Sequence, residues 1–276
     1  MAQITIDNRN GSRPRPRLAR SRSRFGLPLG FEIALLATGL LSYRMVRTWV
    51  KDEVGEAREN AARVVDWERA IGIFTEVDLQ STVLGNDAVV WMLNRYYFFG
   101  HLLGTALVLG FVFVFRHDHY GRIRRVLFTV TLAGLVLHVL FPLAPPRWFP
   151  EHGFVDTLQT YGPKIYDSDT VASAANQIAA MPSLHVGWAI ICGWALVTAL
   201  TSPWRWLALL HPVITTLAVV LTANHWWLDA LAAMALVFAA VLADRPIQGW
   251  LERRAERRAA SSARPEPSAA VDTLVA

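Results

Sequence analysis

The chain has 276 residues, of which 53% are hydrophobic and only 18% are charged, and it contains 11 tryptophans. Together with a mean hydropathy of +0.30, this composition excludes an ordinary soluble domain and indicates an integral membrane protein. The net charge of +5 comes with arginine-rich tails, which we interpret as topology signals near anionic lipid and not as a nucleic-acid-binding surface.

Six apolar runs are long enough to cross a bilayer, and they predict an all-α fold, a six-helix transmembrane bundle. The expected spans are residues 27–43, 96–115, 126–143, 184–200, 206–223 and 228–243. The first has only eleven residues between Glu32 and Arg44, so charged side chains must snorkel at its ends. Because it follows a long basic tail and lacks a small-residue cleavage pattern, we expect it to remain as an anchor.

Basic residues predict the orientation of the spans. Of the 27 lysines and arginines, 18 lie in the two tails and in the loops 116–125 and 202–205. The positive-inside rule places these segments in the cytoplasm of a multi-pass protein of the cell membrane. We therefore expect residues 1–26 to form a disordered cytoplasmic tail, residues 27–245 the membrane domain, and residues 246–276 a second, mostly disordered cytoplasmic tail.

Two segments are expected on the extracytoplasmic side. Residues 44–94 combine charges with apolar residues at a spacing typical of an amphipathic helix on the membrane surface. The apolar positions are Val46, Trp49, Val50, Val54, Ala57, Ala61, Val64 and Val65. Residues 147–181 contain glycine, proline and short polar side chains, which favour a loop that caps the bundle.

Three short polar stretches fall at the ends of predicted spans, at residues 144–147, 181–185 and 224–229. If the apolar runs between them cross the bilayer, all three emerge on the extracytoplasmic side. Together they bring two imidazoles, a carboxylate and a guanidinium to one place. Such a set of side chains is suited to phosphoryl transfer.

Each of these side chains has a plausible chemical role. His225 and Asp229 are four residues apart, so on a helix the carboxylate can fix the imidazole tautomer and leave the other nitrogen free as a nucleophile. His185 is the candidate acid and base for the leaving and incoming oxygens. Arg147 and Ser183 are candidates for binding the phosphoryl oxygens. No cluster of metal ligands is visible, so neither a metal nor another cofactor is expected.

Other polar residues receive weaker predictions. His101 and His138 lie within spans, where a polar side chain is costly and can line a cavity. Glu68, Glu76 and Tyr97 are weaker candidates for the same role. The remaining histidines, expected to be structural, are His117, His119, His152 and His211. The single cysteine, Cys192, excludes an intramolecular disulfide.

The motif order resembles that of the type 2 phosphatidic acid phosphatase superfamily, over roughly residues 60–244. That superfamily has a Pro-Ser-X-His motif, found here at residues 182–185, and a final His-X-X-X-Asp, found from His225 to Asp229. The details are most similar to the branch that contains inositol phosphorylceramide synthases. The resemblance implies a nucleophilic His225 supported by Asp229, with His185 as the acid and base.

Three departures from the superfamily pattern bear on function. Phe141 stands where a lysine usually precedes the arginine, Trp148 replaces the proline after Arg147, and Val219 replaces an arginine six residues before His225. These differences argue against a simple phosphatase. The same pattern resembles that of the inositol phosphotransferase branch, whose members carry an Ala-Pro-Pro-Arg-like stretch. This resemblance implies that Arg147 is the main phosphate-binding cation.

Several functions fit this pattern. The intermediate can be resolved by a lipid or sugar alcohol such as inositol, or by water, which gives a lipid-phosphate or polyprenyl-diphosphate phosphatase. Either substrate would be a membrane lipid that enters from the outer leaflet, where Trp148, Trp188, Trp226 and Trp227 are expected to anchor the boundary. A transporter or scaffold that retained the fold is less favoured, because the three candidate catalytic side chains are intact. The related vanadate-dependent haloperoxidases use similar residues, but they are typically soluble, so the six predicted spans disfavour that activity.

Overall fold

The structure, a computed structural model, describes residues 53–162 and 178–262, with isolated helical positions between residues 30 and 45. Within this part of the chain the secondary structure is helical and contains no strand; an isolated bridge joins Leu143 and Ala179. The prediction of an all-α fold is confirmed.

Four helical stretches are long and apolar enough to span a membrane. They are α4–η1–α5 (Asp87–Arg95, Tyr96–Gly100, His101–Phe115), α6 (His117–Leu140), η5–α10 (Pro203–Leu209, Leu210–Leu221) and α11 (Trp227–Ser262). A further apolar helix, α9 (Leu184–Ala199), is shorter. These helices indicate a multi-pass membrane protein. Most of the expected first span, residues 27–43, lies outside the described residues, so the count of six remains a prediction.

Helix α9 is the central element of the bundle, packed against α5, α6, α10 and α11. Small residues on α9 permit these close contacts. A Cβ atom at Gly193 would lie only 3.1 Å from the carbonyl oxygen of Ala208. Glycine at this position therefore lets the backbone of η5 approach that of α9 closely.

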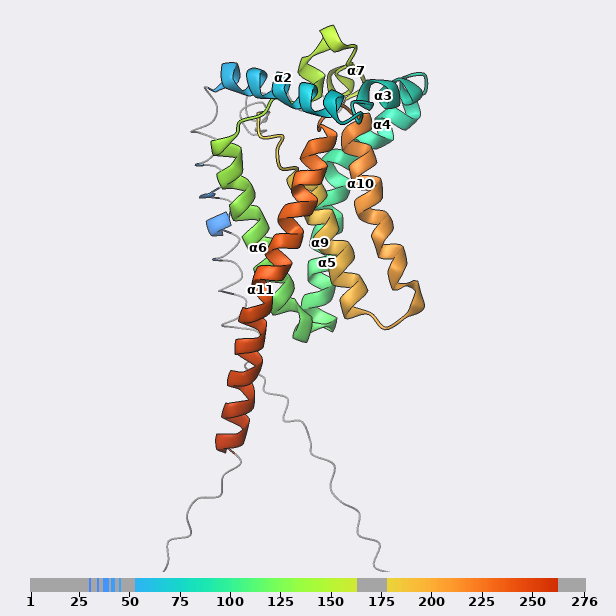
Figure 1. Ribbon diagram of the computed structural model, residues 1–276. Coiled ribbons are helices and arrows are strands. Elements are labelled where there is room, and N and C mark those ends of the chain that lie inside the picture. Colours follow the sequence, from blue (N-terminus) through green and yellow to red (C-terminus); the bar gives the residue numbers. More distant parts are fainter. Residues whose placement is uncertain are drawn as a thin grey trace, which may run out of the picture.

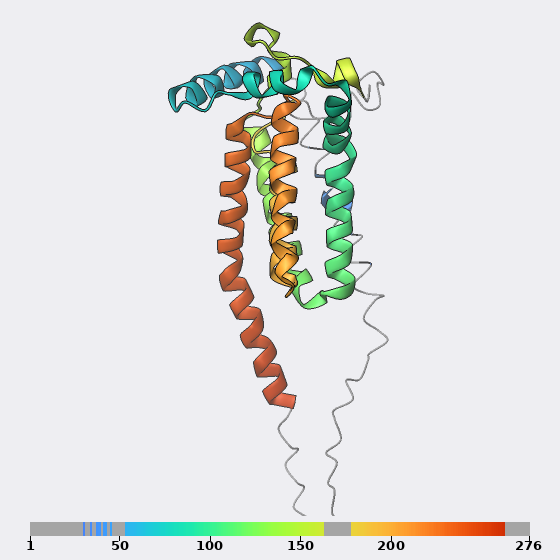
Figure 2. The ribbon, with the colours of Figure 1, turned by 90° about the vertical axis from the view of Figure 1, so that its right-hand side faces the viewer.

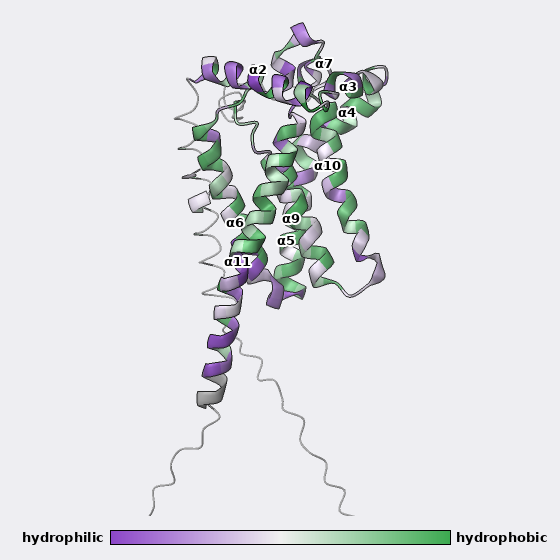
Figure 3. Ribbon diagram, viewed as in Figure 1, coloured by the Kyte–Doolittle hydropathy of each residue, from purple (hydrophilic) through white to green (hydrophobic). Residues whose placement is uncertain are grey.

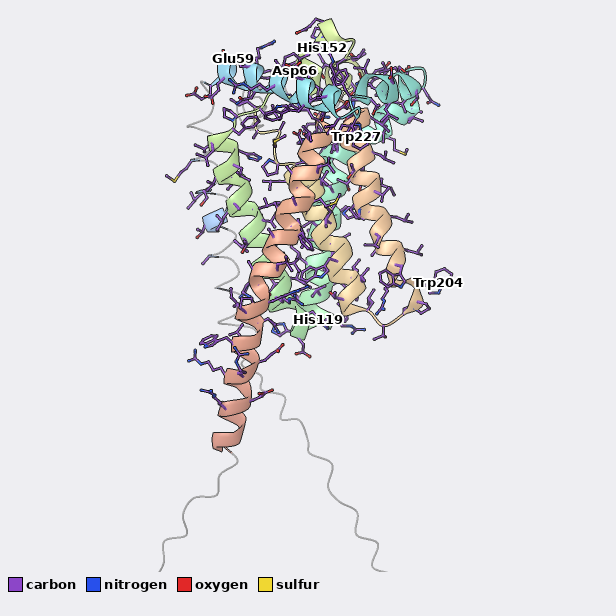
Figure 4. The ribbon with its side chains drawn as sticks, viewed as in Figure 1. Glu59, Asp66, His119, His152, Trp204 and Trp227 are labelled. Atoms are coloured by element: carbon purple, nitrogen blue, oxygen red, sulfur yellow. The ribbon has the colours of Figure 1, made fainter. Side chains whose placement is uncertain are left out.

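One end of the bundle is covered by short helices, and we call it the capped end (Figures 1 and 2). The covering elements are α2 (Val54–Ala70), α3 (Glu76–Leu84), η2 (Pro146–Trp148), η3 (Pro150–His152) and α7 (Thr157–Tyr161). Figure 3 shows apolar residues concentrated in the bundle, with polar residues on α2 and on the distal half of α11. In Figure 4, Glu59, His152 and Trp227 mark the capped end, while His119 and Trp204 mark the opposite end.

Helix α2 is amphipathic, as its apolar spacing predicts. Ala57, Ala61, Val64 and Val65 are all buried at 3% exposure or less, whereas Val54 at the start of the helix is 41% exposed. The buried face packs against the loops of the capped end in a shared apolar core. Helix α2 therefore lies across the bundle and does not run along it (Figure 1).

Asparagine side chains on α2 and α4 form hydrogen bonds to the loops of the capped end. Asn60 of α2 donates from Nδ2 to the carbonyl oxygen of Pro142 at 2.9 Å. Asn94 of α4 donates to the carbonyl oxygens of Thr157 and Gly162 at 2.8 and 2.9 Å. These bonds satisfy backbone groups that would otherwise be buried without partners.

Helix α11 continues well past residue 245, where a disordered tail was expected to begin. It reaches Ser262 and passes through Pro246. At this end of the bundle Asp244, which is 4% exposed, pairs with Arg125 at 2.7 Å and with Arg122 at 3.2 Å. The two arginines belong to α6, so the pairing fixes the middle of α11 against that helix.

Replacing Asp244 with asparagine should destabilise the protein. The change leaves both guanidinium groups without their carboxylate, but these groups are 32% and 26% exposed. Because solvent screens part of the loss, we expect a cost of about 1–3 kcal/mol. Thermal unfolding in detergent micelles measures this cost, with Asp118→Asn on the exposed start of α6 as the control. Equal unfolding temperatures for the two variants would contradict a structural role for the pairing.

Candidate active site

The three polar stretches meet at the capped end of the bundle. The backbone amide of Arg147 in the first stretch donates to the carbonyl oxygen of Ala223 at 2.9 Å. The backbone amide of Ser183 in the second stretch donates to the carbonyl oxygen of Asp229 at 3.2 Å. The third stretch is therefore bonded directly to the second, and the residue that precedes it is bonded to the first, so the convergence expected from the spans is present.

The imidazole of His225 is held by Asp229. Oδ2 of Asp229 lies 3.0 Å from Nδ1 of His225 and also accepts the backbone amide of Trp226 at 2.9 Å. A carboxylate only accepts hydrogen bonds, so the proton of the imidazole lies on Nδ1 and the lone pair of Nε2 is free. Asp229 is completely buried. This arrangement is suited to a histidine nucleophile.

A tight turn between α10 and α11 places His225 at this point. The amides of Asn224 and His225 both donate to the carbonyl oxygen of Val219, at 2.9 and 3.2 Å. Ala223 adopts a left-handed conformation with φ of 52°, which is strained for a residue with a side chain. The bond from the Arg147 amide to the Ala223 carbonyl helps to hold this conformation.

His185 lies in the first turn of α9 beside His225, their ring centroids 5.6 Å apart. On its other side, the His185 ring stacks on Tyr97 at 4.5 Å and contacts His101 at 4.1 Å. Tyr97 belongs to η1, a π-helical turn at the start of a predicted span, and such turns often occur at functional sites. The imidazole of His185, from α9, thus lies next to that of His225, from the turn before α11.

Ser183 is the N-cap of α9. Its Oγ accepts the backbone amide of Val186 at 3.3 Å, a bond that satisfies one of the free donors of the first turn. The hydroxyl can still donate its own hydrogen, and the remaining amides of the helix start favour an anion. The predicted phosphate-binding role of Ser183 is compatible with this geometry.

The guanidinium of Arg147 is buried, with 6% of the residue exposed. Its Nη1 donates to Oδ1 of Asn224 at 2.6 Å, and its Nε lies 3.8 Å from Oδ2 of Asp156. Asn224 is itself oriented by a 2.7 Å bond to the hydroxyl of Thr222. The residue directly before His225 therefore holds the arginine, a function that the sequence did not suggest.

The two buried histidines of the predicted spans have different surroundings. His101, which contacts His185, is fixed by a 2.9 Å contact between its Nδ1 and the carbonyl oxygen of Tyr97. His138 lies 3.1 Å through Nε2 from the carbonyl oxygen of Pro182. His101 therefore adjoins the candidate acid and base, whereas His138 supports the backbone of the second stretch.

Trp226 is a core residue whose buried side chain cannot anchor the membrane boundary, the role expected for it. It is 0% exposed and packs against the aromatic rings of Phe149 and Phe154. Its Nε1 donates to the carbonyl oxygen of Ala144 at 2.9 Å, which joins the third stretch to the first. The tight turn directs this side chain toward the covering elements.

No group of three or more histidine, cysteine, aspartate or glutamate residues within the described ranges is arranged to hold a metal ion.

The family model described as the PAP2 superfamily matches residues 62–243. That range begins in α2, ends in α11 and contains all three polar stretches. Neither a curated protein nor a solved structure matches the chain significantly.

Substituting phenylalanine for Trp226 should weaken the junction of the stretches. The change removes the bond to Ala144 and leaves unfilled space in a fully buried position, at a cost of about 2–4 kcal/mol. Thermal unfolding in detergent should show this loss, while Trp204→Phe, at a site that is 74% exposed, should have little effect. If both variants unfold at the same temperature, Trp226 does not link the stretches energetically.

Proposed function

Because the chain belongs to the PAP2 superfamily, we propose that it is a membrane phosphotransferase or phosphatase in which His225 accepts a phosphoryl group from a phosphorylated lipid. The observation that carries this proposal is the bond between His225 Nδ1 and Asp229 Oδ2, made beside a second imidazole and a buried guanidinium. The bond directs the reactive Nε2 away from the carboxylate.

In the first step, the lone pair of His225 Nε2 attacks phosphorus. A P–N bond forms as the bond from phosphorus to the lipid oxygen breaks, and its electron pair stays on that oxygen. His185 donates a proton to the leaving oxygen. Asp229 stabilises the positive charge that develops on the imidazole of His225.

In the second step, an acceptor hydroxyl replaces the departed alcohol. His185, now deprotonated, takes the proton of this hydroxyl as its oxygen attacks phosphorus. The P–N bond breaks, and its electron pair returns to Nε2 of His225. The enzyme is thereby regenerated, and one histidine serves as acid and then as base.

The phosphoryl oxygens remain negative throughout, so they need fixed positive charge. Arg147 supplies it, with Ser183 as an additional donor. The positions where the superfamily usually has further cations do not contribute: Phe141 stacks on Trp67 at 6.3 Å, and Val219 is 1% exposed in an apolar cluster. This reduced set of cations supports transfer to a lipid or sugar alcohol such as inositol as the first candidate, with water as the alternative acceptor.

The substrate is proposed to enter from the extracytoplasmic leaflet. The candidate site is at the capped end, whereas Arg122 and Arg125 belong to the opposite end, near Asp244. By the positive-inside rule, the arginine-rich end is cytoplasmic. A lipid headgroup would then reach Arg147 at the membrane surface while its acyl chains remain between helices.

A covalent intermediate on His225 is the first expected consequence. Purified protein incubated with lipid labelled in the phosphoryl group should carry acid-labile label on the wild type and none on His225→Gln. Asp229→Asn should retain the fold and lower kcat by about 100-fold or more, because the imidazole loses its orienting carboxylate. His119→Gln, exposed at the opposite end of the bundle (Figure 4), is the control. Label that persists in His225→Gln would exclude this nucleophile.

The acceptor is identified by a product screen. Candidate phospholipids and polyprenyl diphosphates are offered with and without inositol, and the products are determined by mass spectrometry. We expect a new phosphodiester that depends on the added alcohol, in the presence or absence of EDTA. Free phosphate as the sole product would assign hydrolysis, and loss of all turnover in EDTA would contradict a reaction without metal.

A further inference from the structure

The start of α11 is bound by two glutamates from the covering helices. The first backbone amides of a helix have no partner within that helix. The amide of Leu228 donates to Oε1 of Glu68 in α2 at 2.8 Å, and the amide of Trp227 donates to Oε1 of Glu76 in α3 at 3.1 Å. Asp229 takes the preceding amide, that of Trp226. Carboxyl groups therefore accept three successive amides at the position where the chain leaves His225.

The two glutamates are neighbours. Both are 0% exposed and bind adjacent amides of α11, and their carboxyl groups interact with one another. In each of them Oε2 is buried and lacks a bond to any other described group. Two carboxylates cannot satisfy one another, because both only accept. A single proton between them makes one a donor and satisfies both oxygens.

We propose that Glu68 and Glu76 share a proton and act as positioning residues that hold the start of α11, and with it Asp229 and His225, in the geometry for phosphoryl transfer. The inference rests on the proposed function of His225. Neither glutamate touches the reacting atoms, since both act through the backbone of the helix. Their second role is electrostatic, because the shared proton leaves the pair with one negative charge near Asp229 instead of two.

The groups around the pair support a retained proton. Burial is the main cause that raises the pKa of Glu68 to about 10, followed by the hydrogen bond and charge of Glu76. The Leu228 amide opposes this shift, and the charge of Asp229 adds to it. Asp229 is in turn bonded to His225. Glu68 is thus faced by two other carboxyl groups, that of Glu76 from α3 and that of Asp229 from α11.

A raised pKa links the pair to stability. Between the ordinary value of 4.5 and about 10, the folded chain keeps a proton that the unfolded chain has released. The retained proton therefore contributes its full stabilisation of the fold below the unfolded pKa of 4.5. This stabilisation decreases as the pH rises and is lost above the folded pKa of about 10. Glutamine cannot titrate, so Glu68→Gln should remove this dependence on pH.

The test uses single and double glutamine variants of the full-length protein in detergent micelles. One glutamine can imitate the protonated partner, since its Oε1 accepts the helix amide and its Nε2 donates to the remaining carboxylate. Two glutamines cannot, because both Oε1 atoms are occupied and two NH2 groups then face each other. Glu59→Gln, on the exposed face of α2, is the matched control.

The readouts are hydrogen exchange of the peptide that spans residues 226–230, the unfolding temperature between about pH 5 and 9, and kcat on the lipid substrate. Each single variant should keep amide protection and kcat within about threefold of the wild type, and Glu68→Gln should unfold with a weaker pH dependence. The double variant should lose protection and at least about tenfold in kcat, far more than the sum of the single changes.

Additive effects of the two substitutions, or an unchanged pH dependence in Glu68→Gln, would overturn the shared proton. A single glutamine that is as damaging as the pair would do the same. Exchange and unfolding are measured without substrate, so they judge this inference even if the wild type transfers no phosphoryl group. That last result would overturn the proposed function alone.

Discussion

The start of α11 is the constraint on which the site depends. His225 precedes the helix and Asp229 lies in its first turn, so the angle between imidazole and carboxylate is fixed by where the helix begins. The free amides at that point need acceptors. They find them in Asp229 itself and in two glutamates from covering helices. Folding of the capped end and formation of the candidate nucleophile are thus one event.

Convergence of the other two stretches follows from the packing of short elements around α9. Gly193 on α9 allows η5 to approach its backbone closely, and the backbone amide of the N-cap Ser183 donates to the carbonyl oxygen of Asp229. The first stretch is joined through Trp226 and through the amide of Arg147. Buried backbone hydrogen bonds are costly to break in a membrane. They therefore keep the guanidinium and the two imidazoles in fixed relative positions.

Much of this arrangement could be predicted from residue spacing alone. The apolar runs locate the described spans, and the four-residue interval from His225 to Asp229 predicts their contact, because both features depend on local periodicity. The buried face of α2 also follows from its apolar spacing, and Glu68 occupies the next position on that same face. The position of Glu68 on an apolar helix face was the available signal that its carboxyl group is buried. The amide that it binds, that of Leu228, lies far away in the sequence and could not be identified in this way.

The features that could not be predicted depend on tertiary contacts. Asn224 acquires its function from Arg147, and Trp226 is buried because the turn at Ala223 directs it inward. The extension of α11 to Ser262 also departs from the expected tail. Part of this extension is held by Arg125 of α6, whose Nη2 donates to Oε1 of Gln248 at 2.9 Å. Local sequence patterns do not predict contacts between residues that are far apart in the chain.

A structure of the protein with bound vanadate tests the central claim most directly, since this anion imitates phosphorus with five oxygen or nitrogen neighbours. The account predicts vanadium bonded to Nε2 of His225, with its oxygens contacting Arg147 and one apical oxygen facing His185. Vanadate bound elsewhere, or at this site but distant from Nε2, would contradict it.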